Sequence, residues 1–469
     1  MISFISIVLC QISHSVNLQG VIDEYSGNSN TYVLSEEVYD GVNIALKSSP
    51  MHFVGHMQSV LVQPETASHS LFAVLSDSHR LENASLSMNK ADSFVTISYD
   101  SSFDFVKCVW MDNVIASPIA IVAGGTVGFT NFDMESTTVE VPLVDSSTDG
   151  STVRVKASSF KNMQVTSSTP MLCTTLTKTV EISASSFKDI SYFPVLSNEE
   201  AEGEEPTKQI NEIVTVNISS SSFKNCEAAL DFSIVPALTA QSLKISSSSF
   251  KECGLVQAVP EYVAKEAQHI QISASSFKNQ HVDLEGKAGF LTFDSEQGVL
   301  EIKSSSFNSF SSSSSSGVIV FKKGSKLQLK WASFSEVDSF GNSSSCVSIE
   351  TIPETLILNN TWFSKCTSSG KAGAIVFGLP NDTAHPSSAN SNTIASTSLY
   401  DNWFEENSGS NASDIFVDDT ALALFDAASF EEMSSYSQSP QVLDASGVSY
   451  ELPINYKRLL KQHAWTVRW

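Results

Sequence analysis

The sequence predicts an all-β protein, a right-handed parallel β-helix (solenoid) with coils of about 27 residues. Three observations lead to this fold class. A Ser-Ser-Phe segment recurs at nearly constant spacing, short stretches of alternating apolar and polar residues precede it, and small residues separate those stretches from the phenylalanine. Regular self-similarity of this length indicates one structural unit stacked many times, so that each unit is stabilised by its neighbours.

The repeat is defined by its phenylalanines. Seven clear copies end at Phe160, Phe187, Phe223, Phe250, Phe277, Phe307 and Phe334. Looser copies carry Phe103, Phe132, Phe363, Phe404 and Phe430. Nine of the eleven intervals between these residues are 26 to 30 residues long. Because equivalent residues of stacked coils lie above one another, we expect the phenylalanines to form an internal aromatic ladder.

Each copy also predicts its own strands. Apolar residues stand seven and five positions before the phenylalanine, for example Val180 and Ile182 before Phe187. This period of two is typical of a strand with one buried face. The small residues that follow favour a bend, where serine can hydrogen-bond the backbone or the serine above it. A mostly apolar position three residues after the phenylalanine, such as Ile190, indicates a second short strand.

The repeat divides the chain into four segments. Residues 1–16 are apolar and short, which predicts a signal peptide, with a first buried strand as the alternative. Residues 17–94 lack the clean repeat and are expected to form irregular first coils and an N-terminal cap. Residues 95–435 are the β-helix repeats, and 436–469 form a C-terminal cap or tail. The tail is basic and partly amphipathic, so a membrane-surface patch and a natural continuation beyond it stay open.

Charge excludes one class of partner. The chain has 27 Lys plus Arg against 51 Asp plus Glu, a net charge of -24. Nucleic-acid binding needs a basic footprint, so no nucleic acid is expected as a partner. No run of 18 apolar residues occurs, which predicts no transmembrane segment in this chain. The expected partner is a glycan or protein ligand of unknown identity.

The predicted location is secreted or cell surface. Six Asn-x-Ser/Thr sequons would be glycosylation sites on that route: Asn83, Asn217, Asn342, Asn359, Asn381 and Asn411. In a chain so rich in serine, several of them can arise by chance. They would be used only in a eukaryotic source.

Two further sets of residues occupy equivalent positions in successive copies. In five copies a lysine directly follows the repeat phenylalanine: Lys161, Lys188, Lys224, Lys251 and Lys278. Stacked coils would align these lysines, either as a polyanion-binding stripe or as a solvated edge with Asp189 and Glu252 alongside. Cys226 and Cys253 share an inward position, which allows either a disulfide between adjacent coils or two buried thiols.

The spacing resembles that of right-handed β-helix proteins of the pectin-lyase-like superfamily. Within it, the chain is similar to non-enzymatic surface proteins of the polymorphic outer-membrane type, which carry Phe-x-x-Asn and Gly-Gly-Ala-Ile motifs. Phe404-Glu-Glu-Asn407 matches the first motif, and Ala372-Gly373-Ala374-Ile375 differs from the second by one residue. The resemblance covers about residues 95 to 435 and implies a parallel β-helix.

The same superfamily contains polysaccharide lyases and hydrolases, so catalysis must be judged from the site. Hydrolases of the superfamily carry an Asp cluster, then Gly-His, then Arg-x-Lys along the chain. This chain does not have that order, because Gly55-His56 and Arg154-Val155-Lys156 come before Asp418-Asp419. A lyase-like Ca²⁺ site from Asp414, Asp418 and Asp419 is conceivable, with acidic residues on a solvated loop as the alternative. No zinc, nucleotide or nucleophile motif occurs, and no cofactor or metal is expected.

These observations predict a secreted or cell-surface β-helix module for adhesion, interaction or structural display, without catalysis. The interpretation is therefore that the protein is not an enzyme. The alternative is a carbohydrate-active β-helix enzyme, either a polysaccharide lyase or a hydrolase. A group of carboxylates with a nearby Arg or Lys would favour that alternative.

Overall fold

A computed structural model gives the fold in two compact units, residues 1–240 (unit 1) and 241–469 (unit 2). It describes residues 16–24, 31–34, 38–40, 44–46, 50–55, 60–63, 70–88, 93–148, 150–167, 170–173, 177–192, 215–227, 229, 234, 240–253, 268–282, 290–312, 318–339, 346–378, 396–418, 421, 425, 430, 432–439 and 441–452. The predicted signal peptide falls almost wholly outside these residues.

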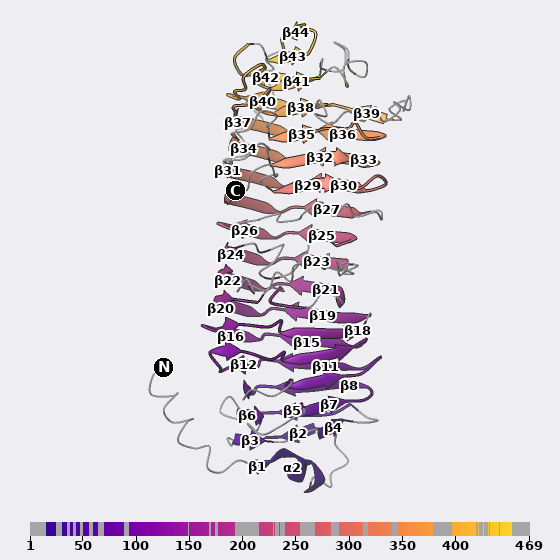
Figure 1. The fold of residues 1–469 in the computed structure, drawn as a ribbon, viewed down its shortest axis with the longest axis vertical. Helices are drawn as coiled ribbons and strands as arrows, with labels where there is room; N and C mark the ends of the chain where they lie inside the picture. The colour runs from indigo at the N-terminus through magenta and orange to yellow at the C-terminus, as the bar shows by residue number, and fades with distance from the viewer. Residues whose placement is uncertain are drawn as a thin grey trace, which may run out of the picture. The chain divides into compact units, whose positions relative to one another are not determined.

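Unit 1 consists of three parallel sheets and one short helix, α2 (Leu18–Glu24) (Figure 1). Sheet A1 contains β1 (Val16–Asn17), β3 (Val38–Asp40), β6 (Val60–Gln63), β9 (Ser85–Met88), β12 (Val109–Trp110), β13 (Val114–Ile115), β16 (Asp133–Glu135), β17 (Thr138–Val139), β20 (Ser159–Val165), β22 (Ser186–Tyr192) and β24 (Ser222–Cys226). Sheet B1 contains β2 (Thr31–Val33), β5 (His52–Val54), β8 (Ser78–Glu82), β11 (Ser102–Val106), β15 (Thr126–Thr130), β19 (Ser151–Lys156), β21 (Thr177–Ser183) and β23 (Thr215–Ser219). Sheet C1 contains β4 (Ile44–Leu46), β7 (Phe72–Val74), β10 (Val95–Ile97), β14 (Ala120–Ala123) and β18 (Val144–Thr148).

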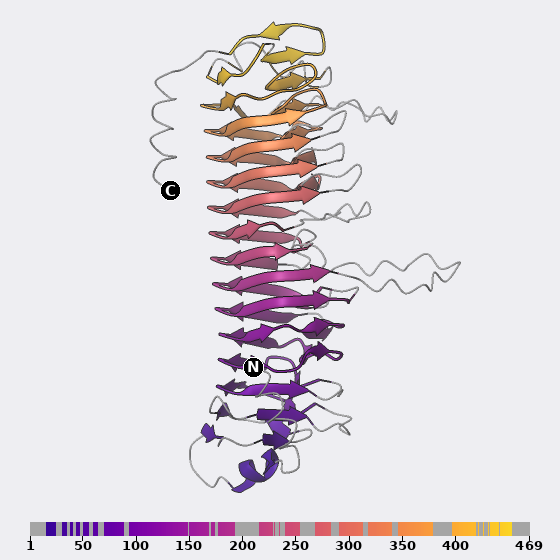
Figure 2. The same ribbon diagram turned by 90° about the vertical axis from the view of Figure 1, so that its left-hand side faces the viewer.

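Unit 2 has the same plan (Figure 2). Sheet A2 contains β26 (Ser249–Lys251), β28 (Ser276–Val282), β31 (Ser306–Ser312), β34 (Ser333–Ser339), β37 (Trp362–Ser368), β40 (Trp403–Glu405) and β42 (Ser434–Tyr436). Sheet B2 contains β25 (Ser242–Ser246), β27 (His269–Ser273), β30 (Val299–Lys303), β33 (Lys326–Lys330), β36 (Thr355–Asn359) and β39 (Ser396–Ser398). Sheet C2 contains β29 (Leu291–Asp294), β32 (Ile319–Lys323), β35 (Val347–Ile349), β38 (Ile375–Phe377), β41 (Ile415–Val417), β43 (Val442–Asp444) and β44 (Ser449–Tyr450).

These sheets confirm the predicted all-β parallel β-helix with coils of about 27 residues. Consecutive coils pair in parallel and in register, as Phe160 pairs with Phe187 in unit 1 and Phe250 with Phe277 in unit 2. The one antiparallel pair among the described strands joins β43 and β44, through a turn in which Gly447 has a φ of 83°. Each coil buries its alternate apolar residues inside, because successive side chains of a strand point to opposite faces.

The phenylalanines stack inside each unit. In unit 1 the ring centroids of Phe160, Phe187 and Phe223 follow one another at 5.0 and 4.8 Å. In unit 2 the rings of Phe250, Phe277, Phe307, Phe334, Phe363 and Phe404 are 4.9 to 5.3 Å apart. The planes of these pairs differ by at most 7°. Each ring is therefore in van der Waals contact with the ring of the next coil.

The predicted register is wrong for three of the looser copies, those of Phe103, Phe132 and Phe430. Met134, and not Phe132, pairs with Phe160 across β16 and β20. Phe103 lies in sheet B1, where it pairs with Val127. Phe404 pairs with Ser435, so Phe430 lies outside the stack. All three phenylalanines are buried, which shows that a buried ring alone does not identify the repeat position.

A second ladder runs through the bend before each phenylalanine. Buried serines occupy it, and in unit 1 the Ser158 amide donates to the Ser185 hydroxyl at 3.1 Å. In unit 2 the Ser248 and Ser275 amides donate to Ser275 and Ser305 in the same way, each at 3.2 Å. Each hydroxyl in turn donates to the carbonyl two residues earlier in its own coil, as Ser275 does to Ser273 at 2.8 Å. The serine repeat therefore satisfies buried backbone groups where the chain turns.

The bends require a left-handed backbone at a residue that is not glycine. This position is held by Asn83, Lys107, Asn131, Ala157, Ala184 and Ser220 in unit 1, and by Ser247, Ala274, Ser304, Trp331, Asn360 and Asp401 in unit 2. Their φ angles lie between 47° and 58°. Asparagine and aspartate tolerate this conformation best among residues with a side chain, whereas a bulky side chain is an outlier there.

Of the two alternatives for Cys226 and Cys253, a disulfide or two buried thiols, the structure has the thiols. Cys226 and Cys253 are buried thiols, and their Sγ atoms donate to the carbonyls of Lys224 and Lys251 at 3.3 and 3.4 Å. The structure instead joins Cys346 to Cys366, with a Cα–Cα distance of 6.5 Å. This disulfide connects the residue directly before β35 in sheet C2 with β37 in sheet A2, 20 residues later. It therefore links two sheets of unit 2 across less than one coil.

Removing this disulfide is expected to lower the free energy of unfolding. A bridge that closes a loop of about 20 residues stabilises by about 3 kcal/mol, mainly by restricting the unfolded chain. The double variant Cys346→Ser/Cys366→Ser should therefore unfold at a lower urea concentration than the oxidised wild type. A reducing agent should lower the midpoint of the wild type and leave that of the variant unchanged. Equal midpoints for wild type and variant would contradict the prediction.

Candidate functional site

A row of polar side chains crosses the outer face of sheet B1. The row contains one residue from each strand in register from β5 to β23: His52, Arg80, Asp104, Gly128, Arg154, Glu181 and Asn217. Gly128 is the one member of this row without a side chain. The strands present them outward because the alternate residues, such as Leu81, Phe105 and Val155, are buried. Arg80 and Arg154 are the two arginines of the described part of the chain, and both lie in this row.

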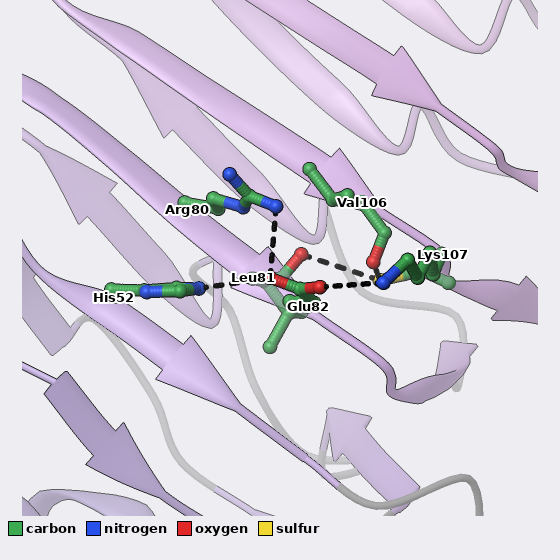
Figure 3. A network of polar contacts seen from close by, with 7 residues as sticks. His52, Arg80, Leu81, Glu82, Val106 and Lys107 are labelled. Atoms are coloured by element: carbon green, nitrogen blue, oxygen red, sulfur yellow. Dashed lines mark hydrogen bonds and ion pairs between the residues drawn. The ribbon is translucent and has the colours of Figure 1, made fainter. Parts of the chain in front are cut away.

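Glu82 gathers three basic side chains at one end of the row (Figure 3). Its Oε2 accepts from the Arg80 guanidinium at 2.8 Å and lies 3.2 Å from His52 Nε2. Its Oε1 accepts from the Lys107 ammonium at 3.1 Å. The Glu82 side chain is 14% exposed, whereas those of Arg80 and Lys107 are 45% and 55% exposed. The hydrogen bond from Lys107 lowers the pKa of Glu82, against an opposing effect of burial, and Arg80 and His52 lower it further.

Asp104 occupies the middle of the row, one coil after Arg80 and two coils before Arg154. Its carboxylate lies over the backbone of Gly128, where a Cβ atom would collide with Asp104 Oδ1. Burial raises the pKa of Asp104, although Arg154 and Arg80 act in the opposite direction. The glycine therefore creates a shallow recess that holds a half-buried carboxyl group close to two guanidinium groups.

Two carboxyl groups with opposite pKa shifts thus share one exposed face. Val106 pairs with Glu82 across β8 and β11, which places Asp104 one strand and two residues away from Glu82. From strand spacing and rise, the two Cα atoms are about 8 Å apart. Where neighbouring environments push two carboxyl pKa values apart, one group can donate a proton while the other remains ionised. The face can therefore combine a proton donor, a carboxylate and several hydrogen-bond donors.

The Asp residues considered from the sequence do not form a metal site in the described part of the chain. Asp414 is fully buried, and its Oδ1 and Oδ2 accept from Asn407 at 3.0 Å and from Ser435 at 2.5 Å. Asp418 is paired with Lys371 at 2.7 Å. Asp419 lies outside the described residues, within which no group of three His, Cys, Asp or Glu side chains is placed to hold a metal ion. The carboxylates of Asp414 and Asp418 are engaged by partners within the protein.

Asp414 is expected to make the stability of unit 2 depend on pH. Burial raises the pKa of Asp414 to about 6, against hydrogen bonds from Ser435, Ser437 and Asn407. The pKa of Asp414 in the unfolded chain is about 4, so the contribution of Asp414 to the free energy of unfolding is largest below pH 4. This contribution falls by up to about 3 kcal/mol as the pH rises through 6. Urea denaturation at pH 4 and pH 7 should show this loss in wild type and not in Asp414→Asn. An identical pH dependence in both proteins would rule the effect out.

The lysine stripe follows the predicted register within each unit. Lys161, Lys188 and Lys224 align in sheet A1, and Lys251 and Lys278 align in sheet A2. Three of the ammonium groups are paired with carboxylates, Lys161 with Glu135, Lys188 with Asp189 and Lys251 with Glu252, at 3.3 to 3.5 Å. Such pairs reduce the positive potential available to an anion. Polyanion binding by this stripe stays a prediction.

Four of the six sequons lie in the described part of the chain. Asn411 is exposed, whereas Asn83, Asn217 and Asn359 are half-buried. Asn359 Oδ1 accepts from Ser398 at 3.0 Å. Asn342 and Asn381 lie outside the described residues. Glycosylation at these positions stays a prediction.

The polar row of sheet B1 was not found from the sequence, although a signal for it exists. Arg80, Asp104, Gly128 and Arg154 are separated by 24, 24 and 26 residues. These steps are close to the coil length, but the Ser-Ser-Phe segment does not give the register there. It is missing from the coils of Arg80 and Gly128, and Ser101-Ser102-Phe103 lies in sheet B1. Counting outward positions back from Arg154 in steps of one coil would have aligned them.

Comparisons with known proteins found similarity to solved structures alone. No protein-family model and no curated protein sequence matches the chain. Among solved structures, tailspike protein 3 of bacteriophage CBA120 is similar at 9% identity and a TM-score of 0.31, over 95% of this chain and 64% of the tailspike chain. The catalytic domain of a GH87 α-1,3-glucanase has 9% identity and a TM-score of 0.28, over 92% and 69%. A PL6 family polysaccharide lyase from Pseudopedobacter saltans has 10% identity and a TM-score of 0.25, over 95% and 98%.

The interpretation that the protein is not an enzyme is contradicted by this set. Two of the three solved structures named above are a glucanase catalytic domain and a polysaccharide lyase. At these identities and TM-scores the similarity assigns no activity to this chain. Among the described residues, no helix is long and apolar enough to cross a membrane.

Proposed function

We propose that the protein is a carbohydrate-active β-helix protein that binds a polysaccharide on the outer face of sheet B1 and hydrolyses it. One observation carries the proposal. A half-buried carboxyl group with a raised pKa, Asp104, lies in a recess over Gly128 between Arg80 and Arg154, beside the ionised Glu82. An exposed, extended row of hydrogen-bonding side chains suits a linear chain of sugars better than a small, enclosed ligand.

The proposed reaction assigns a role to each carboxyl group. Asp104 donates its proton to the glycosidic oxygen as the bond to the anomeric carbon breaks. A water molecule adds to that carbon and gives a proton to Glu82. Arg80 and Arg154 hold the sugar hydroxyls on either side of Asp104. Because the raised pKa of Asp104 comes from burial, the group keeps its proton at a higher pH than an exposed aspartate would.

A location outside the cell and membership of the pectin-lyase-like superfamily are parts of the same proposal. The Cys346–Cys366 disulfide supports a secreted or cell-surface protein, since disulfides persist mainly in oxidising compartments. A signal peptide at residues 1–16 and glycans on the exposed sequons would agree with that route.

The test is a screen of purified protein against soluble polysaccharides. Laminarin, dextran, alginate and polygalacturonate cover neutral and acidic chains. We expect at least one of them to release reducing ends without the ultraviolet absorbance of an unsaturated sugar. Mass spectrometry would identify the products. Reducing ends accompanied by that absorbance would instead indicate elimination by a lyase. Intact polysaccharides after prolonged incubation would contradict the proposal.

A further inference from the structure

Trp331 is an exception among the bend residues of unit 2. It lies between β33 and β34 with a φ of 56°, at the position held by Ser304 and Asn360 in the adjacent coils. A bulky residue in this left-handed conformation costs about 1–2 kcal/mol, and the side chain is nevertheless 65% exposed. No aromatic ring or cation of the described residues packs against the indole. Backbone strain together with an exposed aromatic ring is typical of a functional position.

The polar residues beside Trp331 offer hydrogen bonds. Lys330 pairs in register with Lys303 on one side and with Asn359 on the other. Glu301 binds Lys303 at 2.8 Å and Lys326 at 2.5 Å, so both of those ammonium groups are paired with a carboxylate. Within the described part of the chain, no carboxylate lies within ion-pair distance of Lys330. Its ammonium group is therefore available to a ligand next to the indole.

A second exposed aromatic residue follows two coils after Trp331. The Trp331 amide donates to the Asn359 carbonyl at 3.1 Å, and the Asn360 amide donates to the Tyr400 carbonyl at 2.9 Å. Tyr400 is 43% exposed. Two strand spacings separate the backbones of Trp331 and Tyr400 by about 10 Å, which is close to the length of a disaccharide. Asn359 and Asn360 lie between them.

We propose that Trp331, Lys330, Asn359 and Tyr400 form a second polysaccharide-binding site, one that holds the chain without reacting with it. The C–H groups of a pyranose ring carry partial positive charge and stack on the negative face of an aromatic ring. The two rings take alternate sugars, while Lys330 donates to sugar oxygens between them. This inference rests on the proposed function, because it takes the ligand to be a polysaccharide.

The variant Trp331→Asn tests the site without disturbing the bend. Asparagine occupies the same left-handed position at Asn131 and Asn360, so the variant should be folded and at least as stable as wild type. In affinity electrophoresis through gels containing laminarin, dextran, alginate or polygalacturonate, at least one polysaccharide should retard the wild type. Its Kd should rise about tenfold or more in Trp331→Asn, because the stacking surface is lost. The same polysaccharide should quench the tryptophan fluorescence of the wild type.

A control separates the effect of this ring from the loss of any exposed aromatic residue. Tyr99→Asn, which removes another exposed ring, in unit 1, should be retarded like wild type. The wild type could be retarded through Trp331 and yet cleave none of the polysaccharides. That result would support this site and contradict the proposed hydrolysis. Equal retardation of Trp331→Asn and wild type, or no retardation of the wild type in any gel, would overturn the inference.

Discussion

Asp104→Asn is expected to lower the rate of polysaccharide cleavage by about 10²- to 10⁴-fold, the usual contribution of a general acid. Asparagine has nearly the same size and can remain over Gly128, but it has no carboxyl proton to donate. In the wild type, kcat/KM should fall as the pH rises through the raised pKa of Asp104, because only the protonated group acts as an acid. The residual rate of Asp104→Asn should lack this decrease. The measurement is a pH profile of both proteins.

Gly128→Ala and Asp133→Asn complete that experiment. An alanine Cβ at position 128 would collide with Asp104 Oδ1 and displace the carboxyl group, so the rate should fall although every acidic residue remains. Asp133 is exposed on β16 in sheet A1, and its replacement should leave the rate unchanged. A fully active Asp104→Asn protein would show that the proton comes from another group, and a fully active Gly128→Ala protein would show that the recess is not needed.

Phe277→Ala is expected to lower the free energy of unfolding by about 3–5 kcal/mol, the usual cost of removing a buried phenylalanine. The Phe277 ring lies 4.9 Å from that of Phe250, 5.0 Å from Phe307 and 4.7 Å from Phe290, centroid to centroid. Its removal leaves a cavity that borders the rings of both adjacent coils, and each coil is stabilised by its neighbours. Urea denaturation followed by circular dichroism measures the loss.

Phe277→Leu is the matched variant for this comparison. Leucine fills much of the space but has no aromatic face, so the loss should be about 0.5–1.5 kcal/mol. A large loss for alanine and a small loss for leucine would show that filled volume stabilises the stack more than ring contacts do. Unchanged unfolding of Phe277→Ala would contradict a continuous aromatic core in unit 2.

The coil could be predicted from the sequence because its signal is local and repeated. The alternation at Val180 and Ile182 fixes which face of β21 is buried, and Phe187 follows at a constant distance. The register failed at Phe132, which is two residues away from Met134, the residue that pairs with Phe160. Both side chains are apolar and fully buried. Hydrophobicity alone could not decide between them.

The candidate site and the disulfide depend on relations that the repeat does not encode. Arg80, Asp104 and Arg154 carry no repeated motif, and their spacing identifies a row only when the pairing of β8, β11, β15 and β19 supplies the register. Cys346, directly before β35, and Cys366 in β37 occupy positions that are not equivalent, whereas the sequence analysis considered only a bond between the equivalent Cys226 and Cys253. The recess that holds Asp104 depends on the absence of a side chain at Gly128, which has no signature in the sequence.

The antiparallel strand β44 has a consequence for self-association. A stack of parallel strands exposes unpaired backbone groups on its last strand, and such an edge is a template on which further chains can add to form fibrils. In sheet C2, Tyr450 and Ser449 pair with Val442 and Leu443 of β43, and β44 is only two residues long. A strand of reversed direction and minimal length offers little to an incoming coil. Sheet C2 therefore carries its own protection against polymerisation at this edge.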